Sequence, residues 1–125
     1  MNLNQVTIAT ENTRQLVSFY KKLGLKLIVD ALPRYARLEC PDGEATLSIC
    51  FTDDILLKNN TTLYFENDEL DSVVNKLQDK GITFSQLPKN ESWLWREAKL
   101  QDPDGNNIIL FKAGENRKNP PWRIN

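Results

Sequence analysis

The chain of 125 residues is long enough to bury a hydrophobic core, and its formal net charge is −1 at pH 7. No basic stripe stands out, which argues against nucleic acid as a partner. No apolar run approaches the roughly 18–20 residues of a membrane-spanning helix, and the N-terminus lacks the basic-then-apolar pattern of a secretory signal. We therefore expect a cytoplasmic protein with no membrane partner.

The chain contains no histidine. This absence excludes Ser-His-Asp and Cys-His catalysis, and it also excludes a three-histidine zinc site. Cys40 and Cys50 are the only cysteines, and they form no Cys-x-x-Cys motif. In a cytosolic setting we expect two buried free thiols, with a disulfide between neighbouring strands as the alternative.

A strand and an amphipathic helix are predicted first. Alternating apolar and polar residues predict a strand at 3–10. A helix is expected over 13–22, with Asn12 as N-cap, Gln15 as its capping-box partner and Gly24 as a left-handed C-cap. The apolar stripe of this helix, at positions i, i+3, i+4 and i+7, consists of Leu16, Phe19, Tyr20 and Leu23.

Three further strands complete the first half of the chain. The segments 25–30 and 35–40 are expected to be extended, and Pro41-Asp42-Gly43 has the residues of a turn. The segment 45–52 alternates again and predicts a fourth strand. Residues 53–60 are expected to link the two halves.

The second half repeats this order. A second helix is predicted over 68–80 and ends at Gly81, about 57 positions after Gly24. Residues 87–92 are expected to form a polar loop, and Pro103-Asp104-Gly105 repeats the turn signature. The strands expected in this half are 61–66, 82–85, 93–100 and 106–112.

Strand, helix and three strands, found twice, indicate the α+β class with helices outside. Each module has a single apolar helix stripe, so we expect one cooperative domain over residues 1–125. The tail is either a disordered end or an extended segment docked by Trp122 of Pro120-Pro121-Trp122. The expected parts are modules 1–57 and 58–112 and the tail 113–125.

The repeated order of elements, together with two short motifs, resembles the vicinal oxygen chelate superfamily. The motifs are Phe19-Tyr20 before Leu23-Gly24, and Asp102-Pro103-Asp104-Gly105-Asn106 before the last strand. Glyoxalases, extradiol dioxygenases and bleomycin-resistance proteins belong to this superfamily. The resemblance covers about residues 3–112. It implies a glyoxalase-like fold of two tandem β-α-β-β-β modules that form a cupped mixed sheet, and it implies a homodimer.

In enzymes of that superfamily, four strand residues, usually His and Glu, bind a divalent metal. Matching the helix and glycine landmarks places the equivalent positions at Gln5, Ser48, Thr62 and Ile109. An amide, two hydroxyls and an aliphatic side chain hold a divalent cation poorly. We therefore predict no metal and no cofactor.

The remaining cup is expected to bind a small, partly apolar organic ligand through a few polar groups. The alternative is a closed core in which these polar groups satisfy one another. The residues of the predicted cup are Gln5, Thr7, Ser48, Thr62 and Tyr64, with Ile109 and Phe111 as its apolar wall.

Trp93 and Trp95 share a face if they lie at i and i+2 of one strand, with Glu97 beyond them. Two indoles and a carboxylate suit a flat or cationic ligand. Bleomycin-resistance members, which the fold resembles, bind a planar cationic drug without metal. The alternative is that the tryptophans pack a dimer interface or the tail.

Arg37, Arg96 and Glu97 are expected to be exposed to solvent, and for the arginines an anchor for an anionic ligand is the alternative. Together these patterns predict a small-molecule binding protein of the glyoxalase/bleomycin-resistance type. The alternative is a lyase, isomerase or dioxygenase-like enzyme with an atypical or metal-free site, in which Glu97 or Tyr64 supplies acid–base chemistry. A third reading is a scaffold whose cup is filled by its own side chains.

Overall fold

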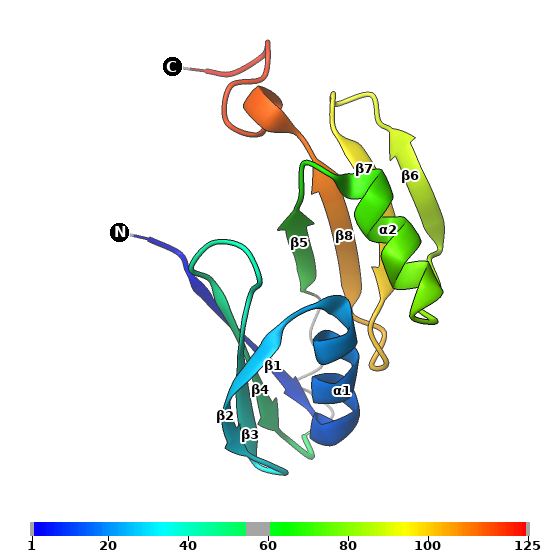
Figure 1. Cartoon of the computed structure of the whole chain (residues 1–125). Coiled ribbons are helices and arrows are strands. Elements are labelled where there is room, and N and C mark those ends of the chain that lie inside the picture. The colour runs from blue at the N-terminus through cyan, green and yellow to red at the C-terminus, as the bar shows by residue number, and fades with distance from the viewer. Residues whose placement is uncertain (1, 55–60, 125) are drawn as a thin grey trace. The chain divides into compact units, whose positions relative to one another are not determined.

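Each half of the chain folds as a strand, a helix and three further strands in the computed structural model, which describes residues 2–54 and 61–124 (Figure 1). This confirms the α+β class and the two β-α-β-β-β modules. By their contacts the residues form two compact units, the first within 1–60 plus 102–105 and the second within 61–101 plus 106–125. Most of the predicted link, with the expected module boundary at 57/58, lies outside the described residues.

The first unit places one helix against a four-stranded mixed sheet. The strands run in the order β1-β4-β3-β2, with β1 and β4 parallel and the other pairs antiparallel. The side chains of Ile8, Leu38 and Ile49 are fully buried on the sheet face toward the helix, as is Leu16 of the helix. The elements are β1 (Gln5–Thr10), α1 (Thr13–Leu23), β2 (Lys26–Ala31), β3 (Tyr35–Glu39) and β4 (Thr46–Phe51).

Helix α1 begins and ends close to the predicted positions, but its N-terminus lacks the predicted side-chain cap. Gly24 ends the helix with φ +117°, in the left-handed region where a side chain would be strained. Asn12 precedes the helix, but its side chain does not cap it, so the expected capping box with Gln15 is wrong. The Asn12 amide donates instead to Asp104.

The second unit repeats the arrangement, with strand order β5-β8-β7-β6 and β5 parallel to β8 (Figure 1). The buried apolar stripe of its helix consists of Leu70, Val74 and Leu77. The elements are β5 (Thr62–Glu66), α2 (Leu70–Asp79), β6 (Gln86–Asn90), β7 (Arg96–Gln101), β8 (Asn107–Lys112) and a 3₁₀ helix, η2 (Gly114–Arg117).

Three predictions for the second unit are wrong, and all concern the segment between α2 and the start of β7. The expected strand at 82–85 is absent, and β6 instead lies where a polar loop was expected. An edge strand tolerates such residues, Pro88 included, because one side of its backbone needs no ladder partner. The strand expected over 93–100 starts at Arg96, because residues before it form a tight turn in which Leu94 adopts φ +68°.

The Asp-Pro-Asp-Gly turn of the second half belongs by its contacts to the first unit. The buried Tyr20 hydroxyl donates to Asp102 Oδ2 at 2.8 Å, and Asp102 Oδ1 accepts the Asp104 backbone N–H at 2.9 Å. The side chains of Thr10 and Asn12 donate to the Asp104 carboxylate. Burial, reinforced by the charge of Asp102, raises the pKa of the Tyr20 phenol. The motif that pointed to the family therefore has a structural role.

Cys40 and Cys50 are free thiols, as expected, but both are half-buried rather than fully buried. Within the described residues, no helix is long and apolar enough to cross a membrane.

Candidate functional site

The positions that correspond to metal ligands in relatives lie on strands of both units. Gln5 and Ser48 lie on the neighbouring strands β1 and β4, and Thr62 and Ile109 lie on the neighbouring strands β5 and β8. The Gln5 amide carbonyl, the best oxygen donor of this set, already accepts the hydroxyl of Thr46. Among residues 2–54 and 61–124, no group of three or more His, Cys, Asp or Glu residues could hold a metal. The residues present do not fit the divalent metal of the family.

In the first unit, the sheet face away from α1 carries a hydrogen-bonded polar cluster, which we call the polar face. Gln5 Nε2 donates to Ser48 Oγ at 2.6 Å and lies 3.5 Å from Thr7 Oγ1. Ser48 is only 1% exposed, so its hydroxyl depends on these partners. The residues of the polar face are Gln5, Thr7, Tyr35, Arg37, Thr46 and Ser48.

Two members of the polar face were not predicted as site residues. Tyr35 Oη lies 2.7 Å from Ser48 Oγ, and Arg37 Nε donates to Tyr35 Oη at 3.0 Å. The hydrogen bond with Ser48 is the largest cause that lowers the pKa of the Tyr35 phenol. Desolvation opposes it, and the hydrogen bond and charge of Arg37 lower the pKa further. Alternation along β3 was the available signal, since buried Ala36 and Leu38 place their neighbours on the opposite face.

In the second unit, the face away from α2 carries a contiguous group of rings, which we call the aromatic face. The rings of Trp95 and Phe111 are stacked, with centroids 4.5 Å apart and an interplanar angle of 14°. Tyr64 meets both edge-on, at 6.1 Å from Trp95 and 5.8 Å from Phe111. Tyr64 lies in β5 and Phe111 in β8, and Trp95 directly precedes β7, the other neighbour of β8.

The expected solvent exposure of Glu97 is wrong, because its carboxylate is buried among these aromatic residues. Glu97 is 2% exposed, and its Oε2 accepts the indole N–H of Trp93 at 2.9 Å. Trp93 lies in the β6–β7 turn rather than in the strand, so the expected i, i+2 pairing with Trp95 is wrong. The tryptophan nevertheless reaches Glu97 from the turn. The indole N–H of Trp95 donates to the Asn116 carbonyl at 3.1 Å.

The predicted site residues thus fall into two groups, each within one unit. Gln5, Thr7 and Ser48 belong to the polar face. Tyr64, Trp93, Trp95, Glu97 and Phe111 form the aromatic face, which Ile109 flanks opposite Tyr64 in the strand register. Thr62 is exposed on β5.

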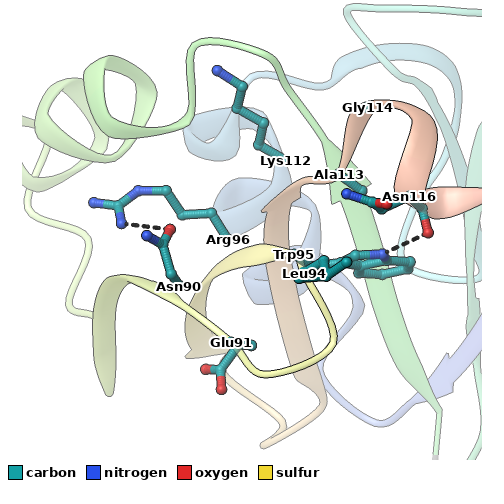
Figure 2. A pocket seen from close by; sticks show the side chains of 9 residues that line it. All are labelled: Asn90, Glu91, Leu94, Trp95, Arg96, Lys112, Ala113, Gly114 and Asn116. Atoms are coloured by element: carbon teal, nitrogen blue, oxygen red, sulfur yellow. Dashed lines mark hydrogen bonds between the residues drawn. The ribbon is translucent and has the colours of Figure 1, made fainter. Parts of the chain in front are cut away.

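A pocket of about 510 Å³ opens beside the aromatic face, between the β6–β7 turn and the start of η2 (Figure 2). In Figure 2, the Trp95 indole points toward Asn116, whereas Arg96 points away toward Asn90. Arg96 is not simply solvent-exposed as expected, because it forms a two-pronged ion pair with Asp71 at 2.9 and 3.1 Å. This partner lowers the pKa of Asp71.

The family model of the Glyoxalase/Bleomycin resistance protein/Dioxygenase superfamily matches residues 2–110. A search of curated proteins found no match. Among solved structures, a glyoxalase/bleomycin resistance protein/dioxygenase from Nocardioides has a TM-score of 0.77 at 21% identity, covering 100% of this chain and 90% of that chain.

Two further structures show the same fold. A lactoylglutathione lyase from Agrobacterium tumefaciens has a TM-score of 0.73 at 12% identity, covering 89% of this chain and 92% of that chain. A bleomycin resistance determinant encoded on the transposon Tn5 has a TM-score of 0.73 at 18% identity, covering 90% and 98%. Because the family model matches most of this chain, the chain belongs to the glyoxalase/bleomycin resistance protein/dioxygenase superfamily.

Proposed function

We propose that the chain binds a small organic molecule without a metal, and that the aromatic face is the binding surface. The observation that carries this proposal is the stacked Trp95–Phe111 pair beside exposed aromatic surface. Tyr64 is 53% exposed and Trp93 is 41% exposed. Large rings left in solvent, next to a pocket with a few polar groups, are typical of ligand sites.

The chemistry of this face favours a flat ligand that carries a positive charge. Exposed π surfaces of Tyr64 and Trp93 attract cations as well as other rings. Glu97 adds a carboxylate that is screened little by water because it is buried. A bleomycin resistance determinant has the same fold, and recognition of a drug-like ligand is part of the proposal for this chain.

Isothermal titration calorimetry of the chelator-treated protein with proflavine, a planar aromatic cation, tests the proposal. We expect saturable binding that Glu97→Gln weakens about 10-fold or more, because the amide retains the shape and an acceptor for Trp93 but loses the charge. The matched control is Glu115→Gln, which removes an exposed charge of the same unit. Equal loss in both variants, or no binding to the wild type, contradicts the proposal.

A metal-free lyase or isomerase is the second candidate, and the burial of Glu97 on the same face as Tyr64 is the observation that favours it. Buried carboxylates at ligand sites commonly exchange protons with substrate. Turnover of S-lactoylglutathione, the compound in the name of one structural neighbour, should then occur without metal and disappear in Glu97→Gln. Binding of proflavine without any turnover favours the first candidate.

We also propose that the protein is a cytoplasmic homodimer, and membership of the superfamily supports the assembly of two copies. Exposed Tyr64 and Trp93 offer a self-association surface as readily as a ligand surface. Analytical ultracentrifugation with and without proflavine separates the two uses. A dimer that proflavine dissociates assigns this face to the interface, whereas a dimer that binds proflavine intact keeps it for the ligand.

A further inference from the structure

On the polar face of the first unit, the hydrogen bonds run in a defined direction. The Thr46 hydroxyl donates to the Gln5 carbonyl oxygen, which turns the Gln5 amide nitrogen toward Ser48. Ser48 Oγ therefore accepts one hydrogen bond from Gln5, and a longer one of 3.4 Å from Arg37 Nε. The proton of Ser48 is left to be donated, and Tyr35 Oη is 2.7 Å away.

This direction leaves the O–H of Tyr35 as the last donor of the chain. Tyr35 Oη receives the Nε–H of Arg37 at 3.0 Å as well as the hydroxyl of Ser48. A phenol oxygen that accepts two hydrogen bonds has its own proton available for a third partner. The lowered pKa of Tyr35 agrees with an oxygen surrounded by donors.

Arg37 supplies a cation at the same place. Its guanidinium carbon lies 5.7 Å from the centre of the Tyr35 ring, and its side chain is exposed. Within the part of the chain that the structure describes, no carboxylate lies within ion-pair distance of Arg37. Its Nε is engaged by Tyr35, so its terminal nitrogens are left as a fork suited to two oxygens of one anion.

We propose that Tyr35 and Arg37 form a binding site for the carboxylate or phosphate group of a small molecule. The fixed, buried Ser48 holds Tyr35, and Tyr35 in turn holds the Nε side of Arg37. The donors are thereby oriented before an anion arrives, which reduces the entropy lost on binding. This site lies in the first unit and does not depend on the aromatic face.

NMR titration of the Arg37 Nε–Hε signal and the Tyr35 ring signals tests the proposal, with benzoate and phenyl phosphate as probes and benzamide as the uncharged control. We expect saturable shifts with at least one anion and none with benzamide. The better anion identifies the group as carboxylate or phosphate. Arg37→Gln should weaken this binding by about 10-fold or more, and Tyr35→Phe by several-fold.

Arg34→Gln is the matched control, because it removes an exposed cation from the same unit at the turn before β3. It should leave anion binding unchanged. Shifts that sodium chloride reproduces at equal ionic strength would overturn the proposal, as would equal weakening by Arg34→Gln and Arg37→Gln. The proflavine experiment tests the aromatic face through Glu97→Gln in the other unit. Failure of the anion site and failure of the proposed function are therefore distinguished.

Discussion

Substituting Tyr20→Phe should destabilise the protein through one lost hydrogen bond. The phenylalanine keeps the buried ring and creates no cavity, so only the 2.8 Å bond to Asp102 disappears. A hydrogen bond to a charged acceptor contributes about 1.5–3 kcal/mol to the free energy of unfolding. The matched control is Tyr64→Phe, whose exposed side chain should change stability by no more than about 0.5 kcal/mol.

Urea unfolding monitored by tryptophan fluorescence and circular dichroism measures this loss. All three tryptophans, Trp93, Trp95 and Trp122, belong to the second unit, whereas Tyr20 belongs to the first. If the chain is one cooperative domain, Tyr20→Phe lowers the fluorescence midpoint as much as the circular dichroism midpoint. Two separated transitions would contradict the single domain. A loss no larger than that of Tyr64→Phe would refute the role of the bond.

Alkaline pH gives a second test of the same bond. Folding raises the pKa of Tyr20 above its usual value of 10.0, so its stabilisation is complete below pH 10. As the pH rises above that value, the unfolded chain ionises Tyr20 while the folded chain does not, and stability falls. Tyr20→Phe should remove this part of the decline. An unchanged alkaline decline in the variant would contradict the burial of an un-ionised phenol.

Three further outcomes are expected. Folding lowers the pKa of Tyr35, so the ionised phenol stabilises the fold above the pKa of the unfolded chain, and this stabilisation is lost as the pH falls through the pKa of the folded chain. Arg37→Gln should raise the pKa of Tyr35 in the folded chain, and an unchanged NMR titration of Tyr35 would contradict the contact between the two side chains. Leu94→Gly should raise the free energy of unfolding by up to about 1 kcal/mol, because an exposed leucine at φ +68° is strained, and thermal unfolding checks the sign. Chelator should leave the melting temperature unchanged and elemental analysis should find less than one divalent ion per chain, whereas a stoichiometric ion whose removal lowers stability would refute the metal-free account.

Local patterns predicted most of the fold. The spacing of Leu16 and Tyr20 fixes the buried stripe of α1, and the left-handed Gly24 ends it. Alternation placed Gln5 and Ser48 each on the polar side of its own strand, and the family resemblance placed both in one cup. The structure finds them in contact. These features depend on periods of 3.6 and 2, which a single sequence displays directly.

The features that the sequence did not predict depend on tertiary contacts. β6 is a polar edge strand whose pairing with β7, rather than its own pattern, makes it extended. The spacing of Trp93 and Trp95 is the same in a strand and in the observed turn, in which Leu94 between them is left-handed. The sequence pattern alone therefore assigned Trp93 to a strand. The hydrogen bond of Tyr20 joins it to Asp102, 82 positions further along the sequence, so no local pattern shows it.

The most direct test of the account is whether proflavine contacts the aromatic face of the chelator-treated protein. Intermolecular nuclear Overhauser effects report such contacts ring by ring. The account predicts effects between the ligand and the ring protons of Tyr64 and Trp93, with no metal added. Effects confined to other residues, or binding that appears only when a divalent metal is supplied, would contradict metal-free recognition at this face.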